Sequence, residues 1–277
     1  MTTRTNTITN PSPTRRTEPF DGVADQYDDL FTNSLIGRAQ RKSVWLEMDR
    51  LFCAGHRVLE INCGTGVDAL HLGARGVNVD ACDASAKMVA VARRRLAASA
   101  YRNRVVLSVL PIEEIGQLAA DTLYDGVLSN FSGLNCVADL PSVALNLARV
   151  VRPGGRMIFC LFGRYCLWEM VWYMLEGDIK RAFRRLRDEG VIAKVAPGHR
   201  VLVRYPSVGS LRRDFAPHFR LLSWKGVGVA VPPSYLEPWA MRFSRLFKLA
   251  AWIDPLLGRW PGFRALGDHT LLVFEKV

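Results

Sequence analysis

The residues best suited to chemistry lie in one short stretch, 57–70. An apolar run, Arg57-Val-Leu-Glu-Ile61, predicts a strand that leads into a turn with Gly64 and Gly66 and then into a helix. This arrangement directs backbone N–H groups and a helix N-terminus at one point beyond the strand. Glu60 stands at the strand tip, where its carboxylate can accept hydrogen bonds from hydroxyls or an ammonium group but would repel a pyrophosphate. The stretch therefore predicts a site for a nucleoside that carries a positive charge.

The run from Glu60 to Gly66 resembles the cofactor loop of class I methyltransferases that use S-adenosylmethionine (SAM). The family usually has glycine where this chain has Asn62. Asparagine tolerates left-handed backbone conformations best after glycine, so we expect the loop to keep its shape. The resemblance implies that SAM binds here, with S-adenosylhomocysteine as product, against Glu60, Asn62, Cys63, Gly64, Thr65 and Gly66.

A second acid follows at the spacing that ribose recognition requires. Residues 76–83 predict a second strand, and Asp83 ends it about 20 residues after the glycine turn, where doubly wound folds place an acid on ribose hydroxyls. Asp80, three residues earlier, is the competing acid, and Asp83 is preferred because it directly precedes the next helix. The run from Asp83 to Met88 resembles the family's Asp-x-Ser-x-x-Met, which implies cofactor contacts for Asp83, Ala84 and Met88.

The third predicted strand, 104–110, has a less regular ending. In the family an Asp that binds the adenine amino group often follows this strand, but here Leu110 and Pro111 occupy the place. We therefore expect adenine recognition by backbone groups near Ile112 or by Glu113.

A fourth predicted strand, 124–130, ends where the reactive methyl group should lie. Ligands of open α/β sheets bind beyond the carboxyl ends of the strands. Asn130 is therefore expected beside the cofactor, and Phe131 and Asn135 beside the acceptor. The chain has Ser-Asn-Phe-Ser at 129–132 instead of the Asn-Pro-Pro-Tyr found in enzymes that methylate base amines or glutamine, which argues against those acceptors.

The remaining elements complete a doubly wound fold. A helix from about 141 to 151 ends at Arg-Pro-Gly-Gly (152–155), a helix stop before the fifth strand at 157–162. Two last strands are predicted at 219–224 and 270–275. The resemblance implies an α/β fold with a seven-stranded, mostly parallel sheet covered by helices on both faces, plus a helical, basic insertion after the fifth strand.

We divide the chain into a disordered tail (1–18) and a single methyltransferase domain (19–277). The domain comprises N-terminal cap helices (19–56), a cofactor-binding core (57–162), a substrate-lid insertion (163–204), and C-terminal strands with an amphipathic helix (205–277). The motif that starts at Phe20 resembles the opening helix of small-molecule and lipid methyltransferases, in which the Tyr lies against SAM. Tyr27 either has that role or packs the helix onto the sheet.

Much of the net charge of +11 lies in one region. Residues 180–220 contain eleven Lys and Arg against three acids, a net of +8. A solvated basic face, an RNA-binding surface and an anionic membrane surface are the open explanations. Just before this region, Trp168 and Trp172 share a helical face, which predicts an apolar helix beside the acceptor.

Residues 235–258 alternate large apolar groups with Arg242, Arg245 and Lys248. This is the pattern of a helix that lies on a membrane, and also of a helix that packs on the catalytic domain with its charges in water. No apolar run is long enough to span a bilayer. We expect a cytoplasmic protein, with peripheral membrane contact through 235–258 left open.

Other features are less informative. The six cysteines include no Cys-x-x-Cys pair, so we expect neither a metal site nor a disulfide framework, and no secretory signal is recognisable. If the acceptor must lose a proton, the candidate bases by type are His71, His199, His218 and His269, and the sequence singles out none.

The leading hypothesis is a SAM-dependent methyltransferase that transfers a methyl group by in-line displacement to a small-molecule, hydrophobic or lipid-like acceptor. An RNA methyltransferase that uses 180–220, and a non-catalytic SAM-binding protein, are the alternatives. A nicotinamide-dependent dehydrogenase is disfavoured because Ala69 stands where its glycine motif requires a third glycine.

Overall fold

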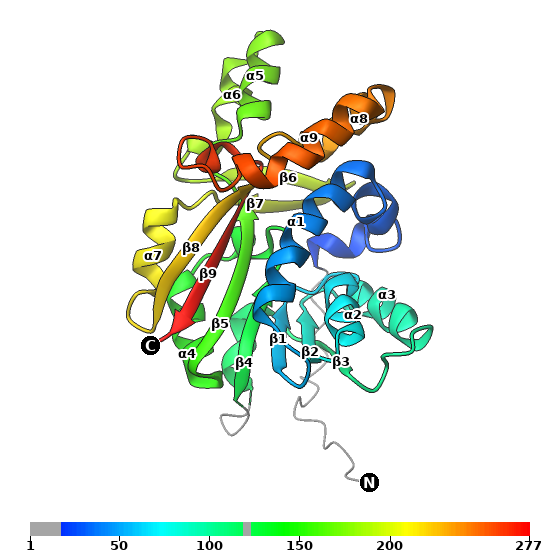
Figure 1. Ribbon diagram of the computed structural model, residues 1–277, viewed down its shortest axis with the longest axis vertical. Helices are drawn as coiled ribbons and strands as arrows, with labels where there is room; N and C mark the ends of the chain where they lie inside the picture. Colours follow the sequence, from blue (N-terminus) through cyan, green and yellow to red (C-terminus); the bar gives the residue numbers. More distant parts are fainter. Residues whose placement is uncertain (1–17, 119–122) are drawn as a thin grey trace.

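A seven-stranded sheet in the order β3-β2-β1-β4-β5-β9-β8 runs through the centre of the molecule (Figure 1). The computed structural model describes residues 18–118 and 123–277, so the predicted tail lies outside the described residues except for Glu18. Strands β1 to β5 are parallel, and β9 is antiparallel to both neighbours. The strands are β1 (Arg57–Ile61), β2 (Asn78–Asp83), β3 (Val105–Val109), β4 (Tyr124–Ser129), β5 (Val151–Phe162), β8 (Phe219–Val227) and β9 (His269–Lys276).

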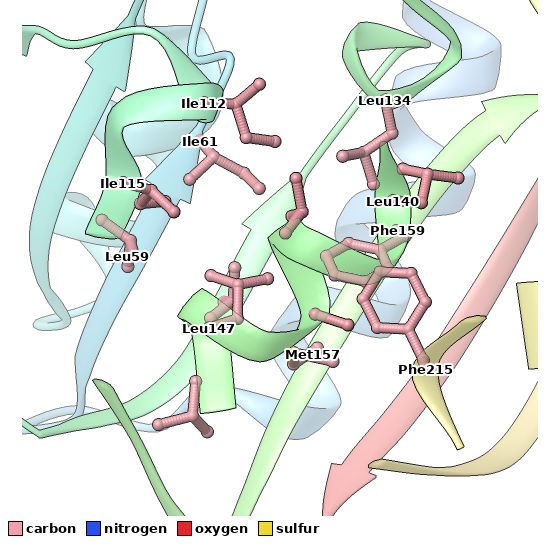
Figure 2. Packing of buried hydrophobic residues seen from close by; sticks show 14 of the residues in the cluster. Leu59, Ile61, Ile112, Ile115, Leu134, Leu140, Leu147, Met157, Phe159 and Phe215 are labelled. Atoms are coloured by element: carbon pink, nitrogen blue, oxygen red, sulfur yellow. The ribbon is translucent and has the colours of Figure 1, made fainter. Parts of the chain in front are cut away.

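Helices cover both faces of this sheet, which confirms the predicted fold class. On one face the strands pack against α4 (Leu140–Val150), α7 (Val208–Phe215) and the 3-10 helix η3 (Ile112–Gln117). Figure 2 shows this core. On the other face lie α1 (Leu35–Leu51), α2 (Val67–Ala74) and α3 (Ala86–Ala97). Because both faces are covered, the central strand β1 is buried from Val58 to Ile61 instead of alternating.

The segment between β5 and α7 is only partly helical. It contains α5 (Leu167–Leu175), α6 (Ile179–Ala182), η5 (Arg184–Leu186) and then a separate hairpin of β6 (Val191–Ala196) and β7 (His199–Val203). The expectation of a helical, basic insertion missed this hairpin. Its signal in the sequence is two short runs rich in β-branched residues, 191–196 and 199–203, separated by Pro197-Gly198, where Gly198 has a φ of 78°.

Two further groups of helices flank the sheet. The chain begins with η1 (Pro19–Gly22) and the π-helix η2 (Asp28–Thr32), and η4 (Gly133–Cys136) follows β4. Residues 235–258 form η6 (Ser234–Leu236), α8 (Glu237–Arg242) and α9 (Ser244–Leu257) instead of one helix, and η7 (Arg264–Leu266) precedes β9. The inner sides of α8 and α9 pack on α1 through a small core, which contains Ile36, Val231, Leu236, Ala240 and Phe247.

Within the described parts of the chain, no helix is both long enough and apolar enough to cross a bilayer.

Candidate active site

A cavity of about 540 Å³ lies beyond the carboxyl ends of β1, β2 and β4, which is the size range of small-molecule sites. Its walls come from η1 and η2, the loop after β1, the starts of α3 and η3, the loop after β4, the β6–β7 hairpin and the start of β9. Segments far apart in the sequence therefore meet there. Of the predicted site residues, these line it: Tyr27, Asn62, Cys63, Gly64, Thr65, Asp83, Ala84, Met88, Ile112, Glu113, Asn130 and Phe131.

The loop after β1 keeps the expected left-handed backbone. Asn62 has a φ of 57°, so the prediction that asparagine can replace the family's glycine there is confirmed. Gly64 and Gly66 have φ values of 53° and 74°. A Cβ on Gly66 would lie 2.9 Å from the Cβ of Ala92 in α3, so this glycine also permits close packing of the loop on the helix.

Asp83, and not Asp80, faces the cavity. Its carboxylate accepts hydrogen bonds from the N–H groups of Gly64 (2.9 Å) and Ser85 (2.8 Å), which fix it between the loop and α3. Burial raises the pKa of Asp83 to about 6, against the opposing effect of these bonds. Asp80 is instead bound by Arg57 and by the hydroxyl of Tyr124. The competition between the two acids is resolved by which one lies at the end of β2.

A buried charge network lies on the other side of the loop. Asp68 accepts hydrogen bonds from Arg41 (2.5 Å), Trp45 (2.6 Å) and Asn130 (2.8 Å). Burial alone would raise the pKa of Asp68, but Arg41 and the hydrogen bonds lower it below its ordinary value. Arg41 lines the cavity, and its Nε has no hydrogen-bond partner among the described residues. Sequence reasoning missed Arg41 because it lies in α1, distant from every recognisable motif.

Glu60 is not part of the cavity wall. It is 1% exposed, and its Oε2 has no hydrogen-bond partner within the described ranges. Burial, and next the charge of Asp68, raise its pKa well above its ordinary value. A buried carboxyl with an orphaned oxygen fits a ligand that brings a positive charge, since an ammonium or sulfonium group would offset the cost of ionising it.

The N-terminal helices are tied to the nucleoside end of the cavity. Asp21 accepts a hydrogen bond from the hydroxyl of Ser85 (2.6 Å), and Asp28 accepts one from the hydroxyl of Thr65 (2.8 Å). Arg95 in α3 pairs with Asp28. These contacts hold Tyr27, which lies between them in the chain, at the cavity wall. Sequence analysis expected a cap here but did not identify the two acids that fasten it.

The cavity wall around Phe131, after the end of β4, is mostly apolar. Phe131, whose φ of 50° is unusual for a bulky residue, packs edge-on against Phe31 (ring centroids 4.8 Å apart). The guanidinium carbon of Arg41 lies 4.6 Å from the centroid of the Phe131 ring. The β6–β7 hairpin adds Ala193, Val195, Val201 and Val203 to the apolar wall, and it packs on η1 and η4.

Three predicted acceptor contacts need correction. Asn135 is fully buried and uses its side chain internally, donating to the carbonyl of Arg204 (2.6 Å) and accepting from the N–H of Phe162 (2.8 Å). Trp168 donates to the carbonyl of Ala230 and packs on Trp239, and Trp172 lies at the surface of α5. None of the three lines the cavity: Asn135 is turned inward in η4, and α5, which carries the two tryptophans, projects away from the sheet (Figure 1). Gly66 also lies outside the wall, as the N-cap of α2.

Comparison with known proteins bears on what this cavity binds. Residues 58–155 match a family model described as a methyltransferase domain. The chain is 29% identical to demethylmenaquinone methyltransferase from Symbiobacterium thermophilum over 232 residues, which span 74% of this chain and 86% of that protein. It is 30% identical to the ubiquinone/menaquinone biosynthesis C-methyltransferase UbiE from Geotalea daltonii over 165 residues, which span 56% of this chain and 67% of that protein.

The chain belongs to the class I SAM-dependent methyltransferases. The fold agrees: the structure of the CcbJ methyltransferase from Streptomyces caelestis superposes with a TM-score of 0.60 at 16% identity, covering 94% of this chain and 98% of that one. The prediction of a SAM-dependent enzyme is confirmed, and the alternative of a non-catalytic SAM-binding protein is dropped.

The residues of the methyltransferase fit this cofactor. In the cavity wall, Arg41 offers an unpaired guanidinium N–H and Asp83 offers carboxylate oxygens for hydroxyls, and behind the wall Glu60 has an unpaired carboxyl oxygen. When bound, SAM supplies an electrophilic methyl group, because its sulfur carries a positive charge. What the protein must then add is alignment of the acceptor and exclusion of water. The apolar, hairpin-covered end of the cavity meets that need.

Proposed function

We propose that this methyltransferase acts on a hydrophobic, quinone-like small molecule. The observation that supports this most directly is the apolar end of the cavity, where aromatic side chains and the β6–β7 hairpin leave space for a planar, apolar group. Aromatic rings pack favourably on such a group by stacked or edge-on contacts. The curated relatives at 29% and 30% identity are named for menaquinone and ubiquinone biosynthesis, which agrees with this acceptor class.

The proposal assigns the two ends of the cavity to the two reactants. Asp83, Ala84, Met88, Ile112 and Glu113 hold the nucleoside. Glu60 and Arg41 hold the charged groups of the methionine part, and Tyr27 closes over it. Phe131 and the hairpin contact the acceptor, and the part of the predicted lid that does so is 191–203 rather than the helix α5.

The test is transfer of labelled methyl from SAM by the purified protein. The acceptor probe is demethylmenaquinone reduced to its quinol, because an electron-rich ring is nucleophilic and the quinone is not. In parallel, a cell extract is incubated and separated into lipid, RNA, protein and aqueous pools. We expect label in the quinol and in the lipid pool. Label in RNA alone would overturn the proposal and favour the basic region 180–220.

One observation weakens the RNA alternative. Two of the cations counted in 180–220 are used inside the protein: Arg185 is 6% exposed, and Arg184 and Arg185 both pair with the buried Glu169. The net charge of +8 counted for residues 180–220 therefore overstates the positive charge that could bind RNA phosphates.

We further propose that the protein approaches its acceptor at an anionic membrane surface. On α9, Leu246, Leu249, Trp252 and Leu256 are 51–71% exposed and recur at helical spacing, so they form one apolar outer face. Arg242, Arg245 and Lys248 are exposed beside them. The single acid within 241–260, Asp254, is buried and accepts the N–H groups of Gly228, Ala230 and Val231.

Charge and shape both favour a bilayer as the partner. Exposed apolar groups flanked by cations, with no acid on the outer face, complement anionic lipid headgroups. Helix α5 ends in the exposed Leu175 and lies at the same end of the molecule as α9 (Figure 1). Two apolar projections thus point away from the sheet together.

Replacing Leu249 and Trp252 with serine should weaken binding to vesicles that contain anionic phospholipid by about tenfold or more, because each apolar side chain contributes about 1.5–3 kcal/mol on burial. Cosedimentation at low and high salt measures this. The matched control is Leu145→Ser on α4, which removes an equally exposed leucine from another face. Equal binding by the three proteins would contradict a membrane role for α9.

A further inference from the structure

One of the four histidines that are candidate bases by type, His269, lies in the cavity wall. His269 begins β9 and pairs across the sheet with Phe162, the last residue of β5. Its ring stacks on the ring of Phe162, with centroids 4.8 Å apart. It packs edge-to-face with the ring of Phe131, with centroids 5.4 Å apart. It is 3% exposed overall, yet it lines the cavity. Two aromatic rings therefore fix the imidazole beside the space proposed for the acceptor.

An acid that directly precedes the strand lies beside this imidazole. Nδ1 lies 3.4 Å from Oδ2 of Asp268, within ion-pair distance, and it forms no hydrogen bond with a described residue. Since the two nitrogens lie on different edges of the ring, Nε2 is turned away from Asp268. A base oriented in this way by a carboxylate is the arrangement that general base catalysis uses.

Asp268 is in turn held by side chains from two other elements, η5 and α1. Its Oδ1 accepts a hydrogen bond from Arg185 (2.8 Å) and its Oδ2 accepts one from Gln40 (3.2 Å). Arg185 is fixed by Glu169 of α5, so a buried chain of charges runs from α5 to the cavity. Burial opposes ionisation of Asp268, but His269 and Arg185 lower its pKa below the ordinary value. The acid is therefore ionised and available to stabilise a protonated imidazole.

The charged groups that face His269 are Asp268 and, behind it, Arg185. Burial lowers the pKa of His269 below its ordinary 6.5, Asp268 opposes this, and Arg185 adds to it. The imidazole is therefore neutral at pH 7, which is the form that can accept a proton.

We propose that His269 is the general base of the methyl transfer and that Asp268 is its positioning residue. The role rests on the proposed function, because it concerns an acceptor with a hydroxyl or activated C–H group. Overall, one proton leaves the acceptor for Nε2 of His269 as the acceptor atom bonds to the methyl carbon. The carbon–sulfur bond breaks and sulfur keeps the electron pair. The imidazolium, stabilised by Asp268, then returns its proton to water.

Kinetics of His269→Gln, with reduced demethylmenaquinone as probe, test the proposal. We expect kcat to fall by about 10²–10⁴-fold, with the affinity for SAM in calorimetry and the melting temperature close to those of the wild type. In the wild type, kcat/KM should decrease as the pH is lowered through the pKa of His269. The variant should not show this decrease. The matched control is His218→Gln, outside the cavity. A variant with wild-type turnover and pH profile would overturn the role.

A second measurement does not depend on the acceptor. In protein with ¹⁵N-labelled histidine, NMR should show His269 neutral at pH 7, with the proton on Nδ1 and a titration below 6.5. A charged imidazole at pH 7, or a proton on Nε2, would overturn the proposal even if the quinol is methylated. If the wild type does not methylate the quinol while NMR gives the expected tautomer, the proposed acceptor class is wrong. The activities of the wild type and His269→Gln are then compared on the fraction of the cell extract that takes up labelled methyl. Asp268 itself is not replaced, because the buried Arg185 depends on it.

Discussion

Replacing Asp83 with alanine is expected to lower the affinity for SAM by about 100-fold or more. The carboxylate would lose its hydrogen bonds to ribose hydroxyls, and a bond to a charged group contributes about 1.5–3 kcal/mol. Titration calorimetry measures the affinity. The control is Asp25→Asn, which removes one negative charge from the N-terminal segment at a residue that does not line the cavity. Unchanged affinity would remove Asp83 from the cofactor site.

The pH dependence of SAM binding gives the same prediction a second readout. Burial raises the pKa of Asp83 to about 6, above its ordinary value of 3.8. Protonation of Asp83 therefore stabilises the folded, unliganded protein. This stabilisation is fully present below pH 3.8 and is lost as the pH rises through 6. Ribose requires the ionised form. The affinity of the wild type for SAM should therefore increase by about tenfold per pH unit below pH 6 and level off above it. The Asp83→Asn variant should lack this step.

Replacing Asp68 with alanine is expected to cost about 3–5 kcal/mol of unfolding free energy, because it leaves the guanidinium of Arg41 buried without its partner. Trp45 and Asn130 lose an acceptor in the same change. Urea unfolding measures the loss. Asp25→Ala, which breaks a pair with Arg94 on the surface, should change stability little.

A double variant separates loss of the charge pair from loss of packing. Arg41→Met combined with Asp68→Leu replaces both charges with apolar groups, so it should recover part of the stability that Asp68→Ala loses. It should not recover SAM binding if Arg41 contacts the cofactor. A small loss in Asp68→Ala, below about 1 kcal/mol, would show that Arg41 finds water or another acceptor once Asp68 is removed.

The ionisation of Asp68 affects the pH dependence of folding stability in the opposite direction to that of Asp83. Its pKa in the folded protein is below the ordinary 3.8, since Arg41 and three hydrogen bonds outweigh burial. It therefore stabilises the fold at neutral pH, and this stabilisation is lost as pH falls through the folded-state pKa. Lowering the pH thus has opposite effects through these two carboxyl groups. Asp68 has a buried cation beside it, and Asp83, among the described residues, does not.

The cofactor end of the site could be predicted from sequence because its parts are local. Strand, loop and helix succeed each other within 57–74, and Asp83 ends the next strand. Left-handed backbone at Asn62, Gly64 and Gly66 depends on the residue types themselves. Such features are set by nearest neighbours along the chain, so they can be inferred without knowing the packing.

The acceptor end could not be predicted because long-range packing creates it. Asn135 has a suitable amide for a substrate, but its position beneath the hairpin commits both ends of the amide to the backbone of Arg204 and Phe162. Trp168 and Trp172 have apolar rings, but α5 carries them away from the cavity. A residue type shows what a side chain can do, and only its neighbours show which of its groups remain free.

Local patterns in the sequence predict the fold class, the methyltransferase family and the nucleoside end of the site, because short-range geometry around parallel strands encodes them. Long-range packing sets the rest of the site. It brought Arg41 from α1 into the cavity wall, packed the β6–β7 hairpin against the cavity, and placed His269 beside two aromatic rings. Strand β9 lies beside β5 although more than 100 residues separate His269 from Phe162. A contact of that kind depends on the order of strands in the whole sheet, which no local pattern around either residue contains.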